Sequence, residues 1–463
     1  MKSCAQRRRC LVALHLSLSL SAVLGGVIPH AAATANVWPG AAQASVASLT
    51  VGVPRARQSV SSQPARNSEY RLSPERYEKA VAYSRASYGM YFVSVFLILA
   101  VLWALLEFGV AARFRDWAEG VSDKRFVQAL IFVPLLLLSV DVAELPLRAC
   151  GHVLSIRYQM SVQGWGSWFL DRSKEQLLTI AFALILAIGL SALMRRSPRR
   201  WWLYGWCAAM PVAILLVFIS PWFIDPLFNR FEPLQSTHPQ LVASIEKLTA
   251  RAGVPIPADR MFLMEASEKT NAIDAYVTGL GASKRVVIWD TTIRKAAPDE
   301  TLYIVGHELG HYVLGHIWKG FLFFAALLFA GFYALFRALH WMLGRWSGDW
   351  RLYGAEDWAS LVVLFLLMEI GMFLASPLAN GFSRLQEHAA DVYGLEVTHG
   401  IIPNSAEVAA QAFQVLGETD LADPDPSPFI TLWLYSHPPL AERLALAAEY
   451  DPWSKGETPK YVK

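Results

Sequence analysis

A short segment in the second half of the chain carries the residues best able to do chemistry. It is Thr301–His316, TLYIVGHELGHYVLGH, and it contains His307-Glu308-x-x-His311. Residues four apart lie on one face of a helix, so both imidazoles can hold one ion while Glu308 lies beside them. We expect one zinc ion per chain, because two imidazoles and a carboxylate leave a position open for water. Glu308 would take a proton from that water and later pass it to the leaving amine.

A catalytic zinc site of this kind needs a third protein ligand from elsewhere in the chain. The three-histidine pattern H-E-x-x-H-x-x-G-x-x-H is excluded, because Ile317 stands where its last histidine would be. A later segment, NGFSRLQEHAAD, offers Glu387 and Asp391 on one face of a predicted helix. We expect Glu387 to bind the metal and Asp391 to accept a hydrogen bond from a ligating imidazole. The alternative for this segment is an ordinary solvated helix face.

Composition places these motifs in a membrane protein. Of the 463 residues, 54% are hydrophobic and only 17% are charged, and the mean hydropathy is +0.32. The net charge of +3 gives no reason to expect a nucleic-acid partner. The four cysteines include no C-x-x-C pair, so neither a thiolate metal site nor a disulfide framework is indicated.

Six apolar segments approach the length of about 20 residues that a bilayer requires. They are Tyr91–Val110, Val127–Leu147, Leu177–Leu193, Trp202–Phe223, Phe321–Leu343 and Trp358–Ala379. Asp141, Glu144 and Glu369 lie within these segments or near their ends. Because such acids are costly in lipid, we expect them to face water or a protein-lined cavity.

The order of these features divides the chain into six parts. Lys2 and Arg7 precede an apolar stretch followed by small residues, which is typical of a signal peptide; an uncleaved membrane helix is the alternative. The predicted parts are a signal peptide or first membrane helix (1–35), a disordered tether (36–71), four membrane helices (72–224), the first part of a protease domain (225–318), two membrane helices (319–380) and the second part of that domain (381–463). Two spans separate the ligand-bearing segments, so both emerge on one side of the membrane.

The polar regions have their own predicted elements. We expect Pro221–Pro233 to be irregular and the H-E-x-x-H helix to run without a break into the apolar segment near Trp318. Predicted strands are Arg260–Met264, Asn271–Gly279 and Arg285–Trp289, and predicted helices are Ser244–Ala252, Ser383–His399, Ala406–Leu416 and Ser436–Tyr450.

Seven local motifs, in order, resemble the CAAX prenyl protease 1 family of membrane zinc metalloproteases and, more distantly, the HtpX proteases. They are Pro221–Leu234, Asn271-Ala272, Arg285–Thr291, the H-E-L-G-H motif, S-R-x-x-E-x-x-A-D from Ser383, Ser436–Pro439 and Glu442–Leu444. The resemblance implies a mainly α fold, in which a multi-span membrane helical barrel encloses a water-filled chamber and carries a gluzincin-type zinc-protease domain. It also implies His307, His311 and Glu387 as zinc ligands and Glu308 as the base.

Two further roles rest on the resemblance alone. It implies that His437 lies near the metal and donates a hydrogen bond to the developing oxyanion. It also implies that Asn271 lies on an edge strand, against which the substrate pairs in extended form.

Charge patterning bears on the orientation in the membrane. Basic residues gather in Ala111–Lys124 and Arg195–Arg200, which the positive-inside rule places in the cytoplasm. This puts the protease domain on the extracytoplasmic face, whereas analogy with the family puts it in the cytoplasm. We expect an integral protein of a bacterial inner membrane, in contact with the lipid bilayer.

The sequence therefore predicts a membrane-embedded zinc endopeptidase that cuts membrane-associated or extended peptides. One alternative is a transporter or channel that uses the intramembrane acids, but it leaves the two ligand motifs without a purpose. The other is an inactive scaffold that keeps zinc for folding. The presence of Glu308 beside all three predicted ligands argues against it.

Overall fold

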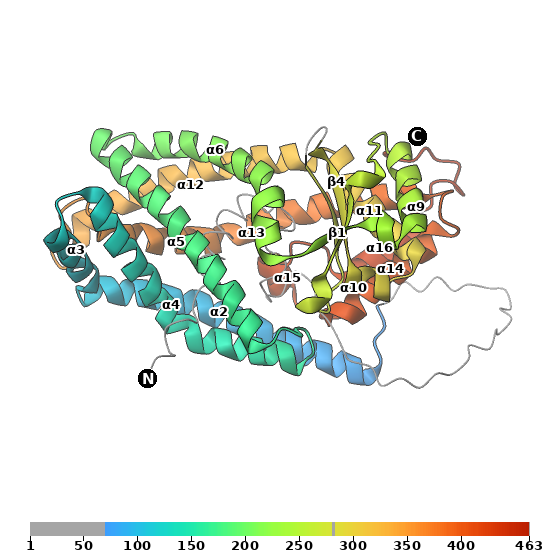
Figure 1. Ribbon diagram of the computed structural model, residues 1–463, viewed down its shortest axis with the longest axis horizontal. Helices are drawn as coiled ribbons and strands as arrows, with labels where there is room; N and C mark the ends of the chain where they lie inside the picture. Colours follow the sequence, from blue (N-terminus) through green and yellow to red (C-terminus); the bar gives the residue numbers. More distant parts are fainter. Residues whose placement is uncertain (1–69, 280–282, 463) are drawn as a thin grey trace.

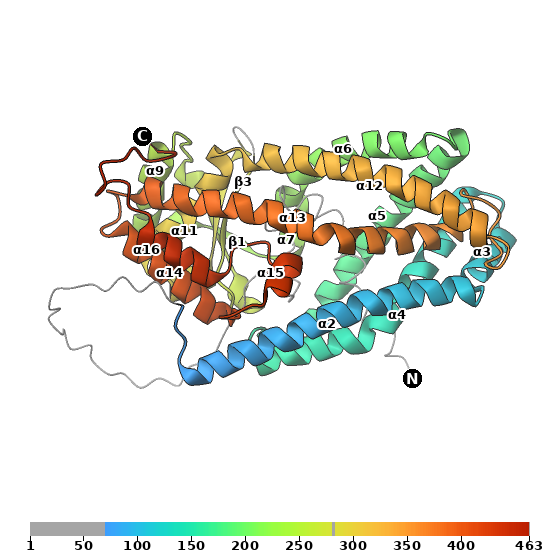
Figure 2. The same ribbon diagram turned by 180° about the vertical axis from the view of Figure 1, so that it is seen from behind.

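The computed structural model describes residues 70–279 and 283–462, so the predicted signal peptide and nearly all of the predicted tether lie outside the described residues. Long helices form an elongated cage, and a smaller mixed domain with a four-stranded sheet lies at one end of it (Figures 1 and 2). The connections at the other end include the basic segments Ala111–Lys124 and Arg195–Arg200 (Figure 1). The predicted protease domain and the basic segments are therefore at opposite ends of the long helices.

Five helices of the described chain are long and apolar enough to cross a membrane. They are α2 (Pro74–Glu107), α4 (Arg125–Arg157), α5 (Trp165–Arg196), α12 (His316–Trp346) and α13 (Ser360–Thr398). Each matches a predicted segment, although α2 stops short of Val110 because Gly109 takes a left-handed conformation with φ +62°.

The fourth predicted span is not one straight helix. It consists of α6 (Trp201–Ile219), the π-helical turn η1 (Ser220–Ile224) and α7 (Asp225–Phe228), with a bend of 50°. Pro221 and Pro226 lie at this bend, and proline cannot supply the backbone N–H that a continuous helix needs. Counted as one span, the bent pair brings the candidates to six.

The acids inside the spans are shielded from lipid by protein. Asp141 and Glu144 are fully buried, and Glu369 is nearly so. Glu144 pairs with Arg148 one helical turn away, and Ser94 donates a hydrogen bond of 2.6 Å to it. The burial of all three acids agrees with the expectation that they avoid the bilayer, although they are enclosed by protein and do not face water.

The two ligand-bearing helices join the membrane helices in different ways. α11 (Pro298–Val313) ends before Gly315, which has φ +68°, and α12 begins afresh at His316. The prediction of an unbroken helix through this point was wrong, because the left-handed residue ends the hydrogen-bond ladder. By contrast, α13 is a single helix that includes both the sixth predicted span and the predicted helix Ser383–His399.

The sheet has the strand order β1-β2-β4-β3. Its strands are β1 (Phe231–Pro233), β2 (Met261–Met264), β3 (Ala275–Thr278) and β4 (Arg285–Trp289). β2 and β4 pair in parallel, while β1 and β3 pair antiparallel at the two edges. The predicted strand Asn271–Gly279 is therefore shorter than expected, and Asn271 precedes the edge strand instead of lying on it. β1 was missed because it forms the end of the proline-containing segment Pro221–Pro233, which was predicted to be irregular.

The remaining helices lie around α11 and the sheet, except for α3 (Val110–Val121), which lies at the opposite end of the cage beside α2 and α4 (Figure 1). The others are α8 (Leu234–Thr237), α9 (Pro239–Arg251), α10 (Asp290–Lys295), α14 (Ser405–Asp420), α15 (Pro428–Leu434) and α16 (Leu440–Glu449), with short 3₁₀ turns η2 (Ala258–Arg260) and η3 (Ala266–Glu268). The last predicted helix starts at Leu440 rather than Ser436, because Pro438 and Pro439 precede it. Buried side chains of the sheet, α11, α14 and the end of α13 form one apolar core, which fixes α11 against its neighbours.

Candidate metal centre

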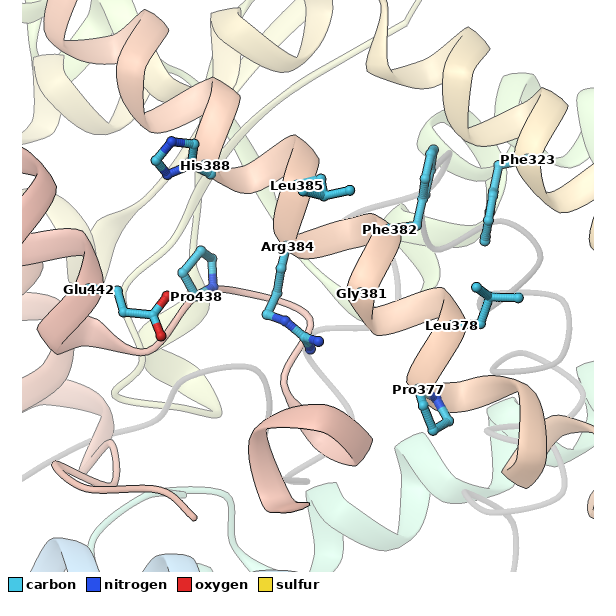
Figure 3. A pocket seen from close by; sticks show the side chains of 10 residues that line it. All are labelled: Phe323, Pro377, Leu378, Gly381, Phe382, Arg384, Leu385, His388, Pro438 and Glu442. Carbon is cyan, nitrogen blue, oxygen red and sulfur yellow. The ribbon is translucent and has the colours of Figure 1, made fainter. Parts of the chain in front are cut away.

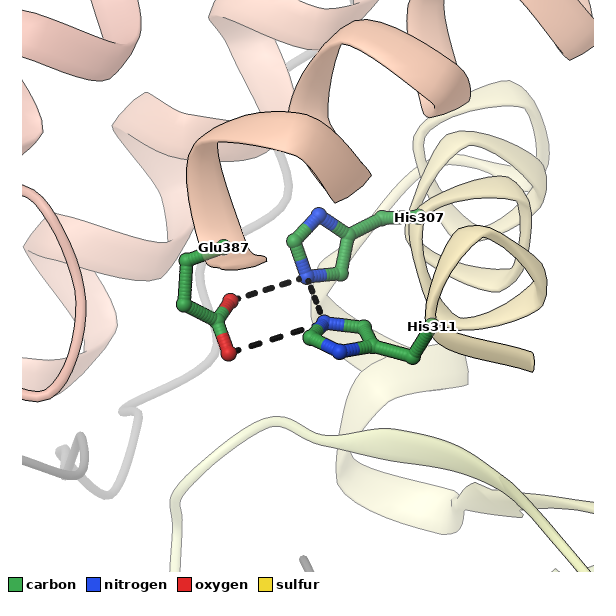
Figure 4. A group of neighbouring side chains, drawn as sticks. All are labelled: His307, His311 and Glu387. Carbon is green, nitrogen blue, oxygen red and sulfur yellow. Dashed lines mark hydrogen bonds and ion pairs between the residues drawn. The ribbon is translucent and has the colours of Figure 1, made fainter. Parts of the chain in front are cut away.

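Three potential ligand atoms meet between α11 and α13 (Figure 4). The Nε2 atoms of His307 and His311 are 3.1 Å apart. Glu387 from α13 brings Oε2 to 3.2 Å from Nε2 of His307 and Oε1 to 3.5 Å from Nε2 of His311. The two motifs paired on sequence grounds are thus adjacent in space.

These separations fit the tetrahedral coordination of one zinc ion. Two ligand atoms bound to zinc at about 2.05 Å lie roughly 3.3 Å apart at the tetrahedral angle. The three distances, 3.1, 3.2 and 3.5 Å, bracket that value. Two imidazoles and one carboxylate are also a donor set that zinc accepts while keeping a fourth position open.

Asp391 lies behind the first imidazole. Its Oδ1 is 2.8 Å from Nδ1 of His307, so the ring's other nitrogen, Nε2, is directed at the ligand group. A carboxylate in this position fixes the tautomer and orientation of a metal-binding histidine. Asp391 is therefore placed where the predicted role requires it.

Arg443 of α16 is a supporting residue that was not predicted from the sequence. Its Nε donates to Oδ2 of Asp391 at 2.9 Å, and its NH2 group donates to Oδ1 at 2.6 Å. All of these side chains are buried, so the two-pronged contact holds the carboxylate toward His307. The sequence carried only a weak signal, an arginine in the E-R-L motif with no stated role.

His316 supports the second imidazole in a similar way. Its Nδ1 lies 3.2 Å from Nδ1 of His311, which leaves Nε2 of His311 for the metal. His316 is buried at the first residue of α12. In the sequence His316 stood out only because it lies one position before Ile317, where the last histidine of the H-E-x-x-H-x-x-G-x-x-H pattern would be.

The carboxylates around His307 favour positive charge on its ring. Burial alone would disfavour the charged ring, but the hydrogen bond and charge of Asp391, aided by Glu387, raise the pKa of His307 to about 10. The same surroundings stabilise a divalent cation, which would replace the proton.

Two other predicted residues border the ligand group. Oε1 of Glu308 is 3.9 Å from Nε2 of His307, so Glu308 is a neighbour of the ligands. His437, in the loop before α16, places Nε2 at 3.3 Å from Oε2 of Glu387 while 43% of its side chain stays exposed. An exposed imidazole beside a ligand group can reach a substrate.

Asn271 stands apart from this group. Its side chain donates a long hydrogen bond of 3.4 Å to the carbonyl of Gln159, and its own carbonyl accepts from Lys295. These contacts tie the segment before β3 to the turn after α4 and to α10. Neither of them links Asn271 to the three ligands.

Glycines allow the two ligand-bearing helices to approach closely. A Cβ at Gly310 would lie 3.1 Å from Cβ of Tyr393, and one at Gly394 would lie 3.2 Å from the backbone nitrogen of His307. Because side chains larger than hydrogen would push α11 and α13 apart, these glycines set the distance between the histidines and Glu387.

Comparison with known proteins agrees with this geometry. Residues 55–230 match the profile of the CAAX prenyl protease N-terminal region, described as five membrane helices, and residues 234–451 match peptidase family M48. The chain is 35% identical over 373 residues to the uncharacterized metalloprotease YhfN of Bacillus subtilis, covering 81% of this chain and 85% of that protein. It is 27% identical over 390 residues to a CAAX prenyl protease 1 homolog of Dictyostelium discoideum, covering 81% and 86% respectively.

A solved structure shares the fold. The crystal structure of Ste24p from S. mikatae superposes with a TM-score of 0.70 at 25% sequence identity, covering 82% of this chain and 89% of that one. These findings confirm the predicted family, the membrane-helical fold and the enzyme class, and they disfavour the transporter alternative. The chain belongs to peptidase family M48 and is a membrane-embedded metalloendopeptidase.

Proposed function

We propose that the metal is a single zinc ion held by His307, His311 and Glu387, and that Glu308 is the general base. The observation that carries this proposal is the tetrahedral spacing of the three donors, with Glu308 beside them. Zinc bound there would supply a Lewis acid for the peptide carbonyl.

Other residues of the chain would transfer the proton, stabilise the oxyanion and position His307. The carboxylate of Glu308 accepts a proton from the attacking water and returns it to the leaving nitrogen. His437 donates a hydrogen bond to the carbonyl oxygen as negative charge develops on it. Asp391 and Arg443 act as positioning residues, since they reach the reaction only through His307.

The substrate is proposed to be an extended peptide attached to or inserted in the membrane. β3 is an edge strand that pairs only with β4 in the described sheet, and an edge offers unpaired backbone groups to a peptide. Asn271 would lie at the start of this edge. Several relatives are named CAAX prenyl proteases, so a prenylated C-terminal peptide is the first substrate to test.

The membrane is proposed from the hydrophobic composition and the signal-like N-terminal segment, and the orientation is proposed from charge. We place the protein in a bacterial inner membrane with the protease domain outside the cytoplasm, because the basic loops lie at the opposite end of the helices. The cytoplasmic orientation expected from the family is the alternative.

The proposal is tested on purified full-length protein. Elemental analysis should find about one zinc per chain. Cleavage of a quenched fluorescent peptide, with and without a prenyl group, should stop after chelation and return with zinc. Cleavage that is unchanged in metal-free protein would refute the zinc mechanism. If only the prenylated peptide is cut, the substrates are prenylated peptides rather than extended peptides in general.

A further inference from the structure

A second candidate binding region lies along α13, next to the metal centre. It is a groove of about 710 Å³, within the size range of small-molecule sites (Figure 3). Arg384 and His388 line it from positions close to Glu387 on α13, and Pro438 follows His437, but none of the lining residues is a proposed metal ligand. The groove therefore borders the metal centre without including its proposed ligands.

The groove changes in polarity along its length. Phe323 of α12 and Phe382 of α13 form one wall as a stacked pair, with ring centroids 3.9 Å apart. Leu378 continues this apolar end toward the membrane part of α13 and is 57% exposed. Arg384, His388 and Glu442 lie at the other end, beside the protease domain (Figure 3). Such a gradient matches an amphipathic molecule at a membrane surface.

The polar end has charges available for a ligand. Arg384 uses NH1 to donate to the carbonyls of Thr431, at 2.8 Å, and Tyr435. Its NH2 group lies beside the floor of the groove, 3.8 Å from where a Cβ on Gly381 would stand. Within the described chain, the Glu442 carboxylate makes no hydrogen bond or ion pair, although its charge acts on Arg384.

We propose that this groove binds one zwitterionic phospholipid from the leaflet on the protease-domain side. Its acyl chains lie along Phe323, Leu378 and Phe382. Its phosphate meets Arg384 and its ammonium group meets Glu442. An anionic headgroup without an amine would satisfy Arg384 but face the Glu442 carboxylate, and an uncharged hydrocarbon would use neither charge. This binding does not depend on the peptidase mechanism.

The lipid is identified by native mass spectrometry of the full-length protein. Delipidated protein is titrated with phosphatidylethanolamine or phosphatidylglycerol, and the retained lipid is counted. We expect one retained phosphatidylethanolamine and weaker retention of phosphatidylglycerol. Glu442→Gln should reduce that preference by about two- to fivefold, as expected for an exposed ion pair. Equal retention of both lipids by the natural protein would overturn the proposal.

A pair of glycine variants locates the site. Gly381→Leu puts a side chain into the floor of the groove and should lower retention at least tenfold. Gly371→Leu is the control, since Gly371 is on the same helix with no atom within 4 Å of an added Cβ, and it should retain lipid. Equal retention by the two variants would show that the lipid binds elsewhere. Glu442 is exposed, so Glu442→Gln still tests the headgroup contact even if Gly381→Leu unfolds.

Discussion

Glu308 and Glu387 approach the same imidazole, but their positions give them different roles. Oε2 of Glu387 lies 3.2 Å from Nε2 of His307, a separation suited to two ligands of one ion. Glu308 stands farther away, at 3.9 Å, on the same helix as the histidines. Glu387 can therefore bind the metal while Glu308 accepts and donates the proton.

The substitution Glu308→Gln separates these roles. It keeps the size of the side chain but removes its ability to accept a proton, so hydrolysis should fall by at least about 10²–10⁴-fold. Zinc content should stay at the parental value, because no ligand is lost. Glu387→Ala is the matched control and should lose both metal and activity. Parental turnover in Glu308→Gln would exclude Glu308 as the base.

Arg443 should matter through geometry as well as charge. Arg443→Lys keeps the positive charge but cannot make the two parallel contacts to Asp391, so zinc affinity should drop about 10–100-fold. Arg294→Lys is a suitable control, because Arg294 makes an exposed ion pair on α10. Competition with a chromophoric chelator measures the zinc affinity of both variants. Equal affinity in the two variants would leave Arg443 without a positioning role.

Zinc affinity should rise with pH. The pKa of His307 is raised to about 10, so at neutral pH the metal-free ring holds a proton that zinc must displace. Each unit of pH increase toward that pKa should strengthen zinc binding about tenfold. Asp391→Asn removes the charge that holds the proton, and its affinity should level off above about pH 7. A flat profile in the natural protein from pH 6 to 8 would contradict this.

The residues of the proposed metal site could be predicted because each pair is close in sequence. His307 and His311, like Glu387 and Asp391, are four residues apart, and helical geometry alone places each pair on one face. Arg443 and His316 could not be assigned in this way. Their roles depend on how α16 and α12 pack against the ligand helices, which no local spacing encodes.

The contact between α11 and α13 sets the distance between the histidines and Glu387. Gly310 and Gly394 lie where these helices touch, and the histidines and Glu387 face one another across the same contact. The sequence showed these glycines but not their purpose. The break between α11 and α12 at Gly315 was not predicted, and α13 continues past Pro377 without interruption.

Gly394→Ala should weaken metal binding. The added Cβ would come within 3.2 Å of the backbone nitrogen of His307 and of the Tyr303 ring, so α11 must shift by a few tenths of an ångström. Metal sites tolerate about 0.2 Å. Gly371→Ala, with open space around it, should instead raise stability by about 0.5–1 kcal/mol. Zinc affinity and thermal unfolding are measured for both variants. Unchanged zinc affinity in Gly394→Ala would show that this glycine does not set the distance between the histidines and Glu387.

At the scale of the whole molecule, the cage has two distinct ends. The segment Arg195–Arg200 contains four arginines, and short basic loops are where the positive-inside rule is most reliable. Every candidate span connects this end with the protease-domain end (Figure 2). One orientation measurement therefore fixes the side of the metal centre.

Cysteine labelling makes that measurement. In a background without natural cysteines, Ser454→Cys lies on an exposed turn of the protease domain and Asp123→Cys lies in the loop between α3 and α4. A membrane-impermeant thiol reagent should label Ser454→Cys in intact cells and Asp123→Cys only after lysis. The reverse pattern would place the protease domain in the cytoplasm.

The interruption of the protease domain by α12 and α13 also imposes an order on biogenesis. A ribosome releases His307 and His311 first, and the third ligand appears only after the intervening spans have been made. At roughly 5–20 residues per second, the nascent chain carries an incomplete centre for several seconds. Arg443 and His437 emerge later still. The proposed metal centre can therefore be completed only after the last span has been synthesised.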